Sequence, residues 1–342
     1  MGIRFSLAAV VALVLAVFLG VKAAGLQVFF GVTVPYIAIF ACLGGIVYRI
    51  LKWGRSPVPF RIPTTAGQQK SLPWIKQSKL DNPTTKGQVV GRMLLEVLLF
   101  RSLFRNTKAE LDKGPKIFYQ WEKWLWLAGL AFHYAFLVIL VRHLRFFAEP
   151  VPFFVYALDS MDGFFQVGLP GIYMSDAIFV AAVTYLFIRR VIIPQIRYIS
   201  LPADYFPLVL LFAIGVTGIL TRFFIRVDLI KVKQLAMSLV SFNPVVPEGI
   251  GVMFYIHFFL VCALFAYFPF SKLMHAGGVF MSPTRNLPND SRINRHINPW
   301  DYPVKVHTYA EYEDHFRAKM VEAGLPVEKE LPAEDAPPAG KN

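Results

Sequence analysis

The sequence predicts an all-α membrane protein of about six transmembrane helices. Of its 342 residues, 56% are hydrophobic and 17% are charged, whereas an ordinary soluble domain contains roughly 25% charged residues. The apolar residues also come in blocks close to the ~20 residues that cross a bilayer core as a helix. These blocks are Phe5–Val21, Val28–Leu51, Trp124–Phe147, Ala177–Pro194, Tyr205–Phe224 and Ile250–Met274.

The first two blocks predict an N-terminal transmembrane hairpin over residues 1–51. Arg4 precedes the first block and small residues follow it, as in a secretory signal peptide. Its apolar region is longer than a signal peptide needs, so we favour a retained span. Cleavage would leave five spans with the same later topology.

Two polar segments lie outside the spans. Residues 52–120 form a basic loop that contains Met93–Phe104, a segment that predicts an amphipathic helix on the membrane surface. Residues 276–342 form a polar tail that ends in ELPAEDAPPAG, a composition typical of disordered chains.

The distribution of Lys and Arg predicts the orientation in the membrane. Arg49–Lys123 holds 15 basic and 5 acidic residues, whereas Ala148–Asp176 holds no Lys or Arg. Because cytoplasmic loops carry the excess of basic residues, we expect a protein of the cell inner (cytoplasmic) membrane with the 52–120 loop and both termini in the cytoplasm. We attribute the net charge of +13 to the difference between the two sides of the membrane and to contact with membrane lipid. We expect no nucleic acid as partner.

Four histidines lie in the third and last predicted spans. His133 and His143 are 10 residues apart, and His257 and His275 are 18 residues apart. An ionisable residue inside a membrane helix is costly and usually functional. Eighteen residues are five helical turns, so His257 and His275 are expected on one helix face. Since the two spans run in opposite directions, His133 should pair with His275 and His143 with His257.

Each histidine pair can fill both axial positions of a haem iron, an arrangement suited to electron transfer. The sequence therefore predicts two b-type haems with these four histidines as metal ligands. In straight helices, His133 and His143 would lie roughly 15 Å apart along the axis, and His257 and His275 roughly 27 Å apart. Helix tilt or the end position of His275 must absorb the difference. Zinc fits less well, because each depth offers only two histidines. The two cysteines, Cys42 and Cys262, lie inside apolar blocks and exclude a CxxCH haem attachment or a cysteine-ligated cluster held by this chain alone.

This histidine spacing resembles the gamma-subunit family of respiratory nitrate reductases, over roughly Trp121–His275. The runs FSKLMHAGGVFMSPTRN (Phe270–Asn286) and RHINPWDYPVKVHTYAEYE (Arg295–Glu313) resemble the cytochrome b subunit, of the DsrM type, of the sulfite-reductase-associated membrane complex. The resemblance implies a four-helix di-haem core over residues 121–275 and no catalytic residue beyond the haem ligands.

The resemblance also implies a function and partners. The chain would be a quinol-oxidising electron-transfer subunit of an oxidoreductase complex in the respiratory chain, with menaquinone as substrate. Electrons would reach a cytoplasmic iron–sulfur subunit related to heterodisulfide reductase, and further iron–sulfur, multihaem c and membrane quinone subunits would complete a complex of sulfur metabolism.

Candidate quinol residues are four arginines expected on the outer side. Arg142 and Arg145 flank His143, and Arg222 and Arg226 lie between the last two spans. The alternative is that these cations pair with haem propionates or lipid phosphates. Asp159 and Asp162 are candidates to accept protons.

Two other functions compete with this interpretation. One is a gamma-type cytochrome b of another complex, such as nitrate reductase, formate dehydrogenase or hydrogenase. The other is a transporter whose histidines relay protons, although such a protein usually shows inverted repeats or broken helices, and neither is evident in the sequence.

Overall fold

The computed structural model of the chain describes residues 2–57, 69–111, 114, 116–290, 292, 303 and 305–329. The chain divides into two compact units, Met1–Asn294 and Arg295–Asn342, which are described separately. The predicted disordered end, from Glu330 onwards, lies outside the described residues.

Five helices in the described part of the chain are long and apolar enough to cross a membrane. Their outward side chains are apolar and exposed, as in Phe40 at 64% and Leu137 at 52%, which is expected where lipid replaces water. The predicted all-α membrane fold is therefore confirmed. The five helices are α1 (Gly2–Lys22), α2 (Val34–Gly54) with the preceding turn Phe29–Thr33, α5 (Lys123–His143), α9 (Pro202–Ile219) and α11 (Val252–Tyr267).

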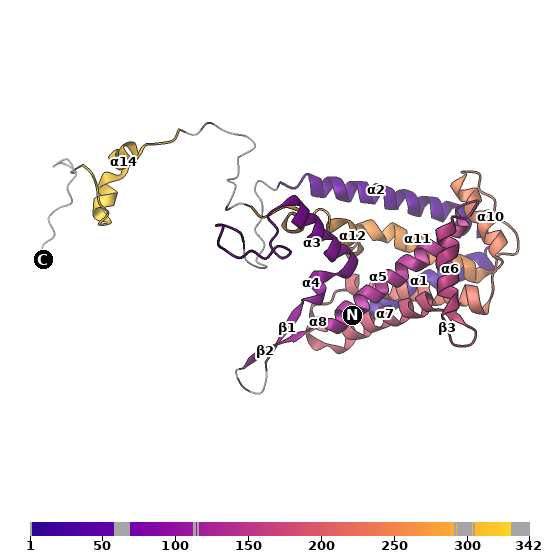
Figure 1. Cartoon of the computed structure of the whole chain (residues 1–342). Coiled ribbons are helices and arrows are strands. Elements are labelled where there is room, and N and C mark those ends of the chain that lie inside the picture. The colour runs from indigo at the N-terminus through magenta and orange to yellow at the C-terminus, as the bar shows by residue number, and fades with distance from the viewer. Residues whose placement is uncertain are drawn as a thin grey trace. The chain divides into compact units, whose positions relative to one another are not determined.

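The remaining predicted span corresponds to α7 (Met174–Ile192), which is helical for 19 residues. It is less apolar because it carries Asp176 near its start and Arg189 and Arg190 near its end. α7 packs against α5 and α9, so it belongs to the same bundle (Figure 1). Its charged residues lie at its two ends, where a helix that crosses a bilayer meets the headgroups.

The bundle core lies where α1, α9 and α11 meet. Val17, Leu210 and Leu260, one from each helix, are completely buried. α9 begins at Leu201, whose backbone N–H donates to the Asp204 carboxylate at 3.0 Å, and Pro202 occupies the first helical position. Pro suits this position because its missing N–H would have no helical partner there. α2 packs along α11, and in Figure 1 it runs along one side of the bundle.

The last span is not one helix from Ile250 to Met274, and that prediction is wrong. α11 ends at Tyr267, and a 3₁₀ turn over Phe268–Phe270 contains Pro269. Ser271 is extended and accepts a hydrogen bond from the Leu273 N–H, which starts the turn Lys272–Met274. Proline ends the helix because it lacks the N–H that a helical bond needs. His275 therefore begins a separate short helix, α12 (His275–Gly278).

The predicted outer end of the bundle carries short elements that the sequence pattern did not indicate. α6 (Phe153–Phe164) is followed by β3 (Gln166–Val167) and β4 (Ile172–Tyr173), which pair antiparallel and lead into α7. α10 (Leu229–Val240) precedes α11, and the Asp228 carboxylate caps its first N–H groups.

At the opposite end, the two predicted polar segments join. α3 (Lys86–Leu99) packs against α13 (Pro283–Asn286), and the Arg92 guanidinium donates to the Thr284 carbonyl at 3.2 Å. α4 (Arg101–Phe104) follows α3, and β1 (Thr107–Leu111) pairs antiparallel with β2 (Ile117–Trp121), which leads into α5. Figure 1 shows this hairpin extending from the end of the bundle where α5 begins.

The second unit contains one helix, α14 (Tyr309–Glu322), among its described residues. The Thr308 hydroxyl and the Glu311 carboxylate form a reciprocal cap at its start. The Glu313 side chain is buried and accepts hydrogen bonds from the backbone N–H groups of Glu328 and Lys329 at 2.8 Å. Part of the polar tail is therefore ordered by its own local contacts.

Candidate functional site

The structure brings the four membrane histidines together as two facing pairs. His133 on α5 and His275 at the start of α12 have ring centroids 5.9 Å apart and planes at 83°. His143 at the end of α5 and His257 on α11 have centroids 6.5 Å apart and planes at 26°. Because the helix breaks at Pro269, His257 and His275 are not separated by the axial rise of 18 helical residues. His275 can therefore face His133 while His257 faces His143.

The spacing of both pairs fits one iron atom between two imidazoles. A metal–imidazole nitrogen bond is about 2 Å long, and two such bonds with the two ring radii place the centroids about 6 Å apart. Aromatic rings in direct contact also lie about 4.5–7 Å apart, so the orientation of the four rings, together with their separation, supports a metal between them.

All four histidines use the same ring nitrogen for hydrogen bonding. Nδ1 of His133 lies 2.7 Å from the Gly129 carbonyl oxygen, and Nδ1 of His143 lies 2.7 Å from that of Ile139. Nδ1 of His275 lies 3.0 Å from the Lys272 carbonyl oxygen. A carbonyl only accepts, so each Nδ1 carries the hydrogen and Nε2 keeps its lone pair. This is the tautomer and orientation of a histidine that ligates a metal through Nε2.

His257 reaches the same state through a hydroxyl group. Its Nδ1 lies 3.0 Å from Oγ1 of Thr217, and that oxygen is 2.7 Å from the Ala213 carbonyl. The Thr217 hydroxyl gives its single hydrogen to the carbonyl, so it accepts the hydrogen of Nδ1. Gly218 adds room, because a Cβ there would lie 3.1 Å from Cε1 of His257.

The His133 ring is flanked by two aromatic edges. Phe100 and Phe132 each meet it edge-on, with centroids 4.9 Å and 4.8 Å away. Phe100 joins α3 to α4 with the left-handed conformation φ 50°, ψ 46°, which is uncommon for a bulky residue and found often at functional sites.

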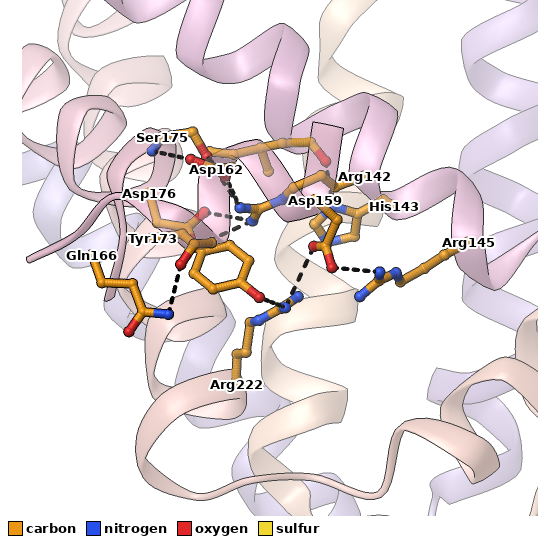
Figure 2. A network of polar contacts seen from close by, with 12 residues as sticks. Arg142, His143, Arg145, Asp159, Asp162, Gln166, Tyr173, Ser175, Asp176 and Arg222 are labelled. Carbon is orange, nitrogen blue, oxygen red and sulfur yellow. Dashed lines mark hydrogen bonds and ion pairs between the residues drawn. The ribbon is translucent and has the colours of Figure 1, made fainter. Parts of the chain in front are cut away.

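Three of the four predicted arginines form a network next to His143 (Figure 2). Arg142 is buried at 4% exposure and forms ion pairs with Asp162 and Asp176. Asp162 also accepts hydrogen bonds from the N–H and hydroxyl of Ser175, at 2.8 Å and 2.6 Å. These contacts tie together the end of α5, α6 and the start of α7.

Arg145 and Arg222 meet at Asp159. Nη2 of Arg145 lies 2.7 Å from Oδ2 of Asp159, and Nη2 of Arg222 lies 3.5 Å from Oδ1. Oδ1 is buried, yet it accepts no hydrogen bond within the described part of the chain. The Tyr173 ring contacts two of these arginines. The guanidinium carbons of Arg142 and Arg222 lie 4.8 Å and 4.4 Å from its centroid.

Arg226 does not join this network. It is exposed, has φ 54°, and follows the π-helical turn Leu220–Phe224 that carries Arg222. Sequence reasoning named neither Tyr173 nor Thr217. Their role depends on contacts between segments distant in sequence, and a lone Thr inside an apolar span gave too weak a signal.

An open cavity of about 670 Å³ lies against α5, α6 and α7. Its lining on α5 includes Ala131, Ala135 and Val138, which face about half a turn away from His133. Asp162 and Ser175 of the network beside His143 also line it. Its rim residues Met161 and Phe164 are 68% and 80% exposed. This cavity is a largely apolar groove on the lipid-facing side of the bundle, and none of the four histidines lines it.

A helical membrane bundle with two facing histidine pairs has the architecture of a b-type membrane cytochrome. Residues 104–295 match the family model of the nitrate reductase gamma subunit. The chain is 50% identical over 281 residues to the Hdr-like menaquinol oxidoreductase cytochrome b-like subunit of Archaeoglobus fulgidus, covering 80% of this chain and 84% of that protein. The subunit of the same description from Archaeoglobus profundus is 44% identical over 274 residues, covering 78% and 81%. The chain therefore belongs to the nitrate reductase gamma subunit family, and the resemblance found in the sequence is confirmed.

Proposed function

We propose that this chain is a di-haem cytochrome b subunit that takes electrons from menaquinol and delivers them across the membrane to a cytoplasmic iron–sulfur partner. The observation that carries the proposal is the geometry of the histidine pairs, in which all four Nδ1 atoms are hydrogen-bonded and both gaps fit an iron. The names of the two Archaeoglobus relatives support menaquinol as the substrate and a partner related to heterodisulfide reductase.

His133 with His275, and His143 with His257, are the residue pairs that would each hold one haem iron. Two b haems, when bound, would supply one-electron carriers. The histidines contribute orientation, since each ring is fixed through its Nδ1 hydrogen bond. The aromatic edges of Phe100 and Phe132 cover part of the His133 ring.

The Asp159 carboxylate is the proposed acceptor for a menaquinol hydroxyl hydrogen. Its Oδ1 is buried and accepts no hydrogen bond among the described residues, whereas Asp162 is saturated by Arg142 and Ser175. Arg145 and Arg222 form ion pairs with Asp159 and are the cations nearest to such a substrate. We assign Arg142 to holding α5, α6 and α7 together, because two carboxylates already neutralise it. Arg226 is available at the surface for a haem propionate or a lipid phosphate.

The rest of the proposal concerns the cell. The charge distribution supports a location in the cytoplasmic membrane with both termini inside. The docking side for the iron–sulfur partner is then the end of the bundle that carries α3, α4 and the β1–β2 hairpin. The motif resemblance supports a complex of sulfite reduction, with further iron–sulfur, multihaem c and membrane quinone subunits.

A stopped-flow measurement tests the direction of electron entry. A menaquinol analogue is mixed with the purified protein, and haem reduction is followed by visible absorbance. We expect His143→Ala to abolish quinol-driven reduction of the haem at His133 and His275, because entry is at the His143 end. Reduction of that haem at the wild-type rate would mean that quinol reacts at the other end.

A further inference from the structure

We propose that α3 and the β1–β2 hairpin form an interfacial anchor, whose apolar faces lie on an anionic lipid surface at the end of the bundle where α5 begins. The proposal rests on the exposure pattern of these elements. It is independent of the haems and of the quinol site.

α3 has its polar and apolar faces reversed relative to a water-exposed helix. Its charged residues Arg92 and Glu96 are 8% and 6% exposed. Arg92 donates to the Thr284 carbonyl, and the Glu96 carboxylate accepts from the Ser102 N–H at 3.2 Å. The opposite face is apolar and exposed. Its four large side chains follow one another at intervals of four, three and one residues, which places them in one stripe along the helix. It consists of Val90 at 57%, Leu94 at 55%, Val97 at 37% and Leu98 at 50%.

The β1–β2 hairpin shows the same separation of faces. Its register places Thr107 opposite Trp121, Ala109 opposite Tyr119 and Leu111 opposite Ile117. Side chains alternate along a strand, so these six residues share one face, and Lys108, Glu110, Phe118 and Gln120 share the other. The first face carries large exposed apolar side chains. They are Leu111 at 75%, Ile117 at 62%, Tyr119 at 71% and Trp121 at 63%.

The hairpin is continuous with a membrane-spanning helix. Glu122 is the one residue between Trp121 and the start of α5 at Lys123, and Trp124 is 73% exposed. The aromatic face therefore meets the membrane at the depth of the lipid headgroups, where Trp and Tyr concentrate. A two-stranded hairpin with one bare apolar face is marginal in water, and lipid at this depth would cover that face.

Basic side chains around the hairpin match a negatively charged surface. Arg105, Lys108, Lys116 and Lys123 are all exposed, and two of them already have carboxylate partners, Arg105 with Asp81 and Lys108 with Glu110. Nζ of Lys123 lies 4.2 Å from the ring centroid of Trp121, the combination of an aromatic ring and a cation that suits a phosphate headgroup. Each basic residue close to an anionic leaflet adds attraction, so the charges point to acidic phospholipid as the occupant.

Two hydrogen bonds fix α3 to the same helix as the hairpin. The Tyr134 hydroxyl donates to the Leu98 carbonyl at 3.0 Å, and Nε1 of Trp126 donates to the Leu99 carbonyl at 2.8 Å. These carbonyls end α3 and would otherwise lack partners. α3 and the hairpin are thus both held at the first turns of α5.

Spin labels on adjacent hairpin residues test the proposal. Tyr119→Cys and Gln120→Cys are made in the full chain with Cys42→Ala and Cys262→Ala, labelled with a nitroxide, and placed in phosphatidylglycerol nanodiscs without any partner subunit. At position 119 we expect accessibility to oxygen several-fold above that to a polar nickel complex. Position 120, one residue away on the polar face, is the control and should show the reverse. Nickel accessibility dominating at both positions would overturn the proposal and assign the apolar face to a protein partner.

Two further measurements complete the test. In phosphatidylcholine discs the oxygen-to-nickel ratio at position 119 should fall, and an unchanged ratio would contradict the role of the cations. Should Tyr119→Cys lower the helix content, the wild type and Trp121→Phe are compared in discs of lipid brominated near the headgroup. The wild type should lose more fluorescence to the bromine than the variant, and equal quenching would contradict burial of Trp121 in lipid.

Discussion

The hydroxyl of Thr217 on α9 accepts the Nδ1 hydrogen of His257 on α11, at 3.0 Å between the two heavy atoms. Of the four histidines, His257 is the one whose Nδ1 is oriented by a side chain from another helix. Its hydrogen bond can therefore be removed by a substitution, which is not possible where the partner is a backbone carbonyl. Replacing Thr217 with Val keeps the shape and removes the acceptor. Removing the hydrogen-bond partner of a metal-ligating histidine typically lowers metal affinity or activity by about 10- to 100-fold.

We therefore expect Thr217→Val to weaken haem retention at the His143–His257 pair about tenfold or more. The measurement is haem loss to apomyoglobin, followed by absorbance. Thr217→Ser restores an acceptor and should behave like the wild type. Equal haem loss from both variants would mean that the hydroxyl does not orient His257.

Gly218 provides a second test of the same pair. A Cβ at this position would lie 3.1 Å from Cε1 of His257, closer than most such contacts, so Gly218→Ala should displace the ring. We expect lower haem content at the His143–His257 pair with normal content at the other. Gly251→Ala is the matched control, since nothing lies within 4 Å of its added Cβ. Full occupancy in Gly218→Ala would show that the ring can move freely.

Asp159→Asn tests the proton acceptor. The amide keeps the size of the carboxylate but cannot take a proton, so quinol-driven haem reduction should slow by about 100-fold, while both haems remain bound. Glu149→Gln serves as control, because that carboxylate is 65% exposed and pairs with Lys233. A normal rate in Asp159→Asn would remove Asp159 from the quinol site.

The two histidine pairs could be predicted from sequence because antiparallel spans leave only one way to match four residues by depth. The break at Pro269 could not be located, since apolar residues continue on both sides of it and the span seemed longer than it is. Thr217 and Tyr173 act on residues from other helices, so no local pattern identifies them. The β1–β2 hairpin was missed because its apolar face is visible only once the register of the strands is known.

The Asp81 carboxylate allows a prediction about pH. Its pKa lies well below the usual range, mainly because Arg101 hydrogen-bonds it, with a further hydrogen bond from Arg105; partial burial opposes the shift. A depressed folded-state pKa means that the ionised group stabilises the fold above its ordinary pKa of 3.8, and that this stabilisation is lost as pH falls from there towards the folded value.

Asp81→Asn should therefore lower the thermal unfolding midpoint at pH 7, measured by circular dichroism, and the difference from wild type should shrink at pH 3. Glu110→Gln, which alters an exposed pair with Lys108, should have little effect at either pH. A difference between Asp81→Asn and wild type that does not change with pH would contradict the assignment.

Haem stoichiometry in paired histidine variants tests the central claim most directly. Pyridine haemochrome analysis of the purified wild type should give two non-covalent b haems per chain. His143→Ala and His257→Ala should each lose one haem, and the double variant should still hold one. Combining His143→Ala with His133→Ala should leave none. A folded wild type without haem, or a His143→Ala/His257→Ala variant that loses both haems while His143→Ala/His133→Ala keeps one, would contradict the pairing on which the proposed function depends.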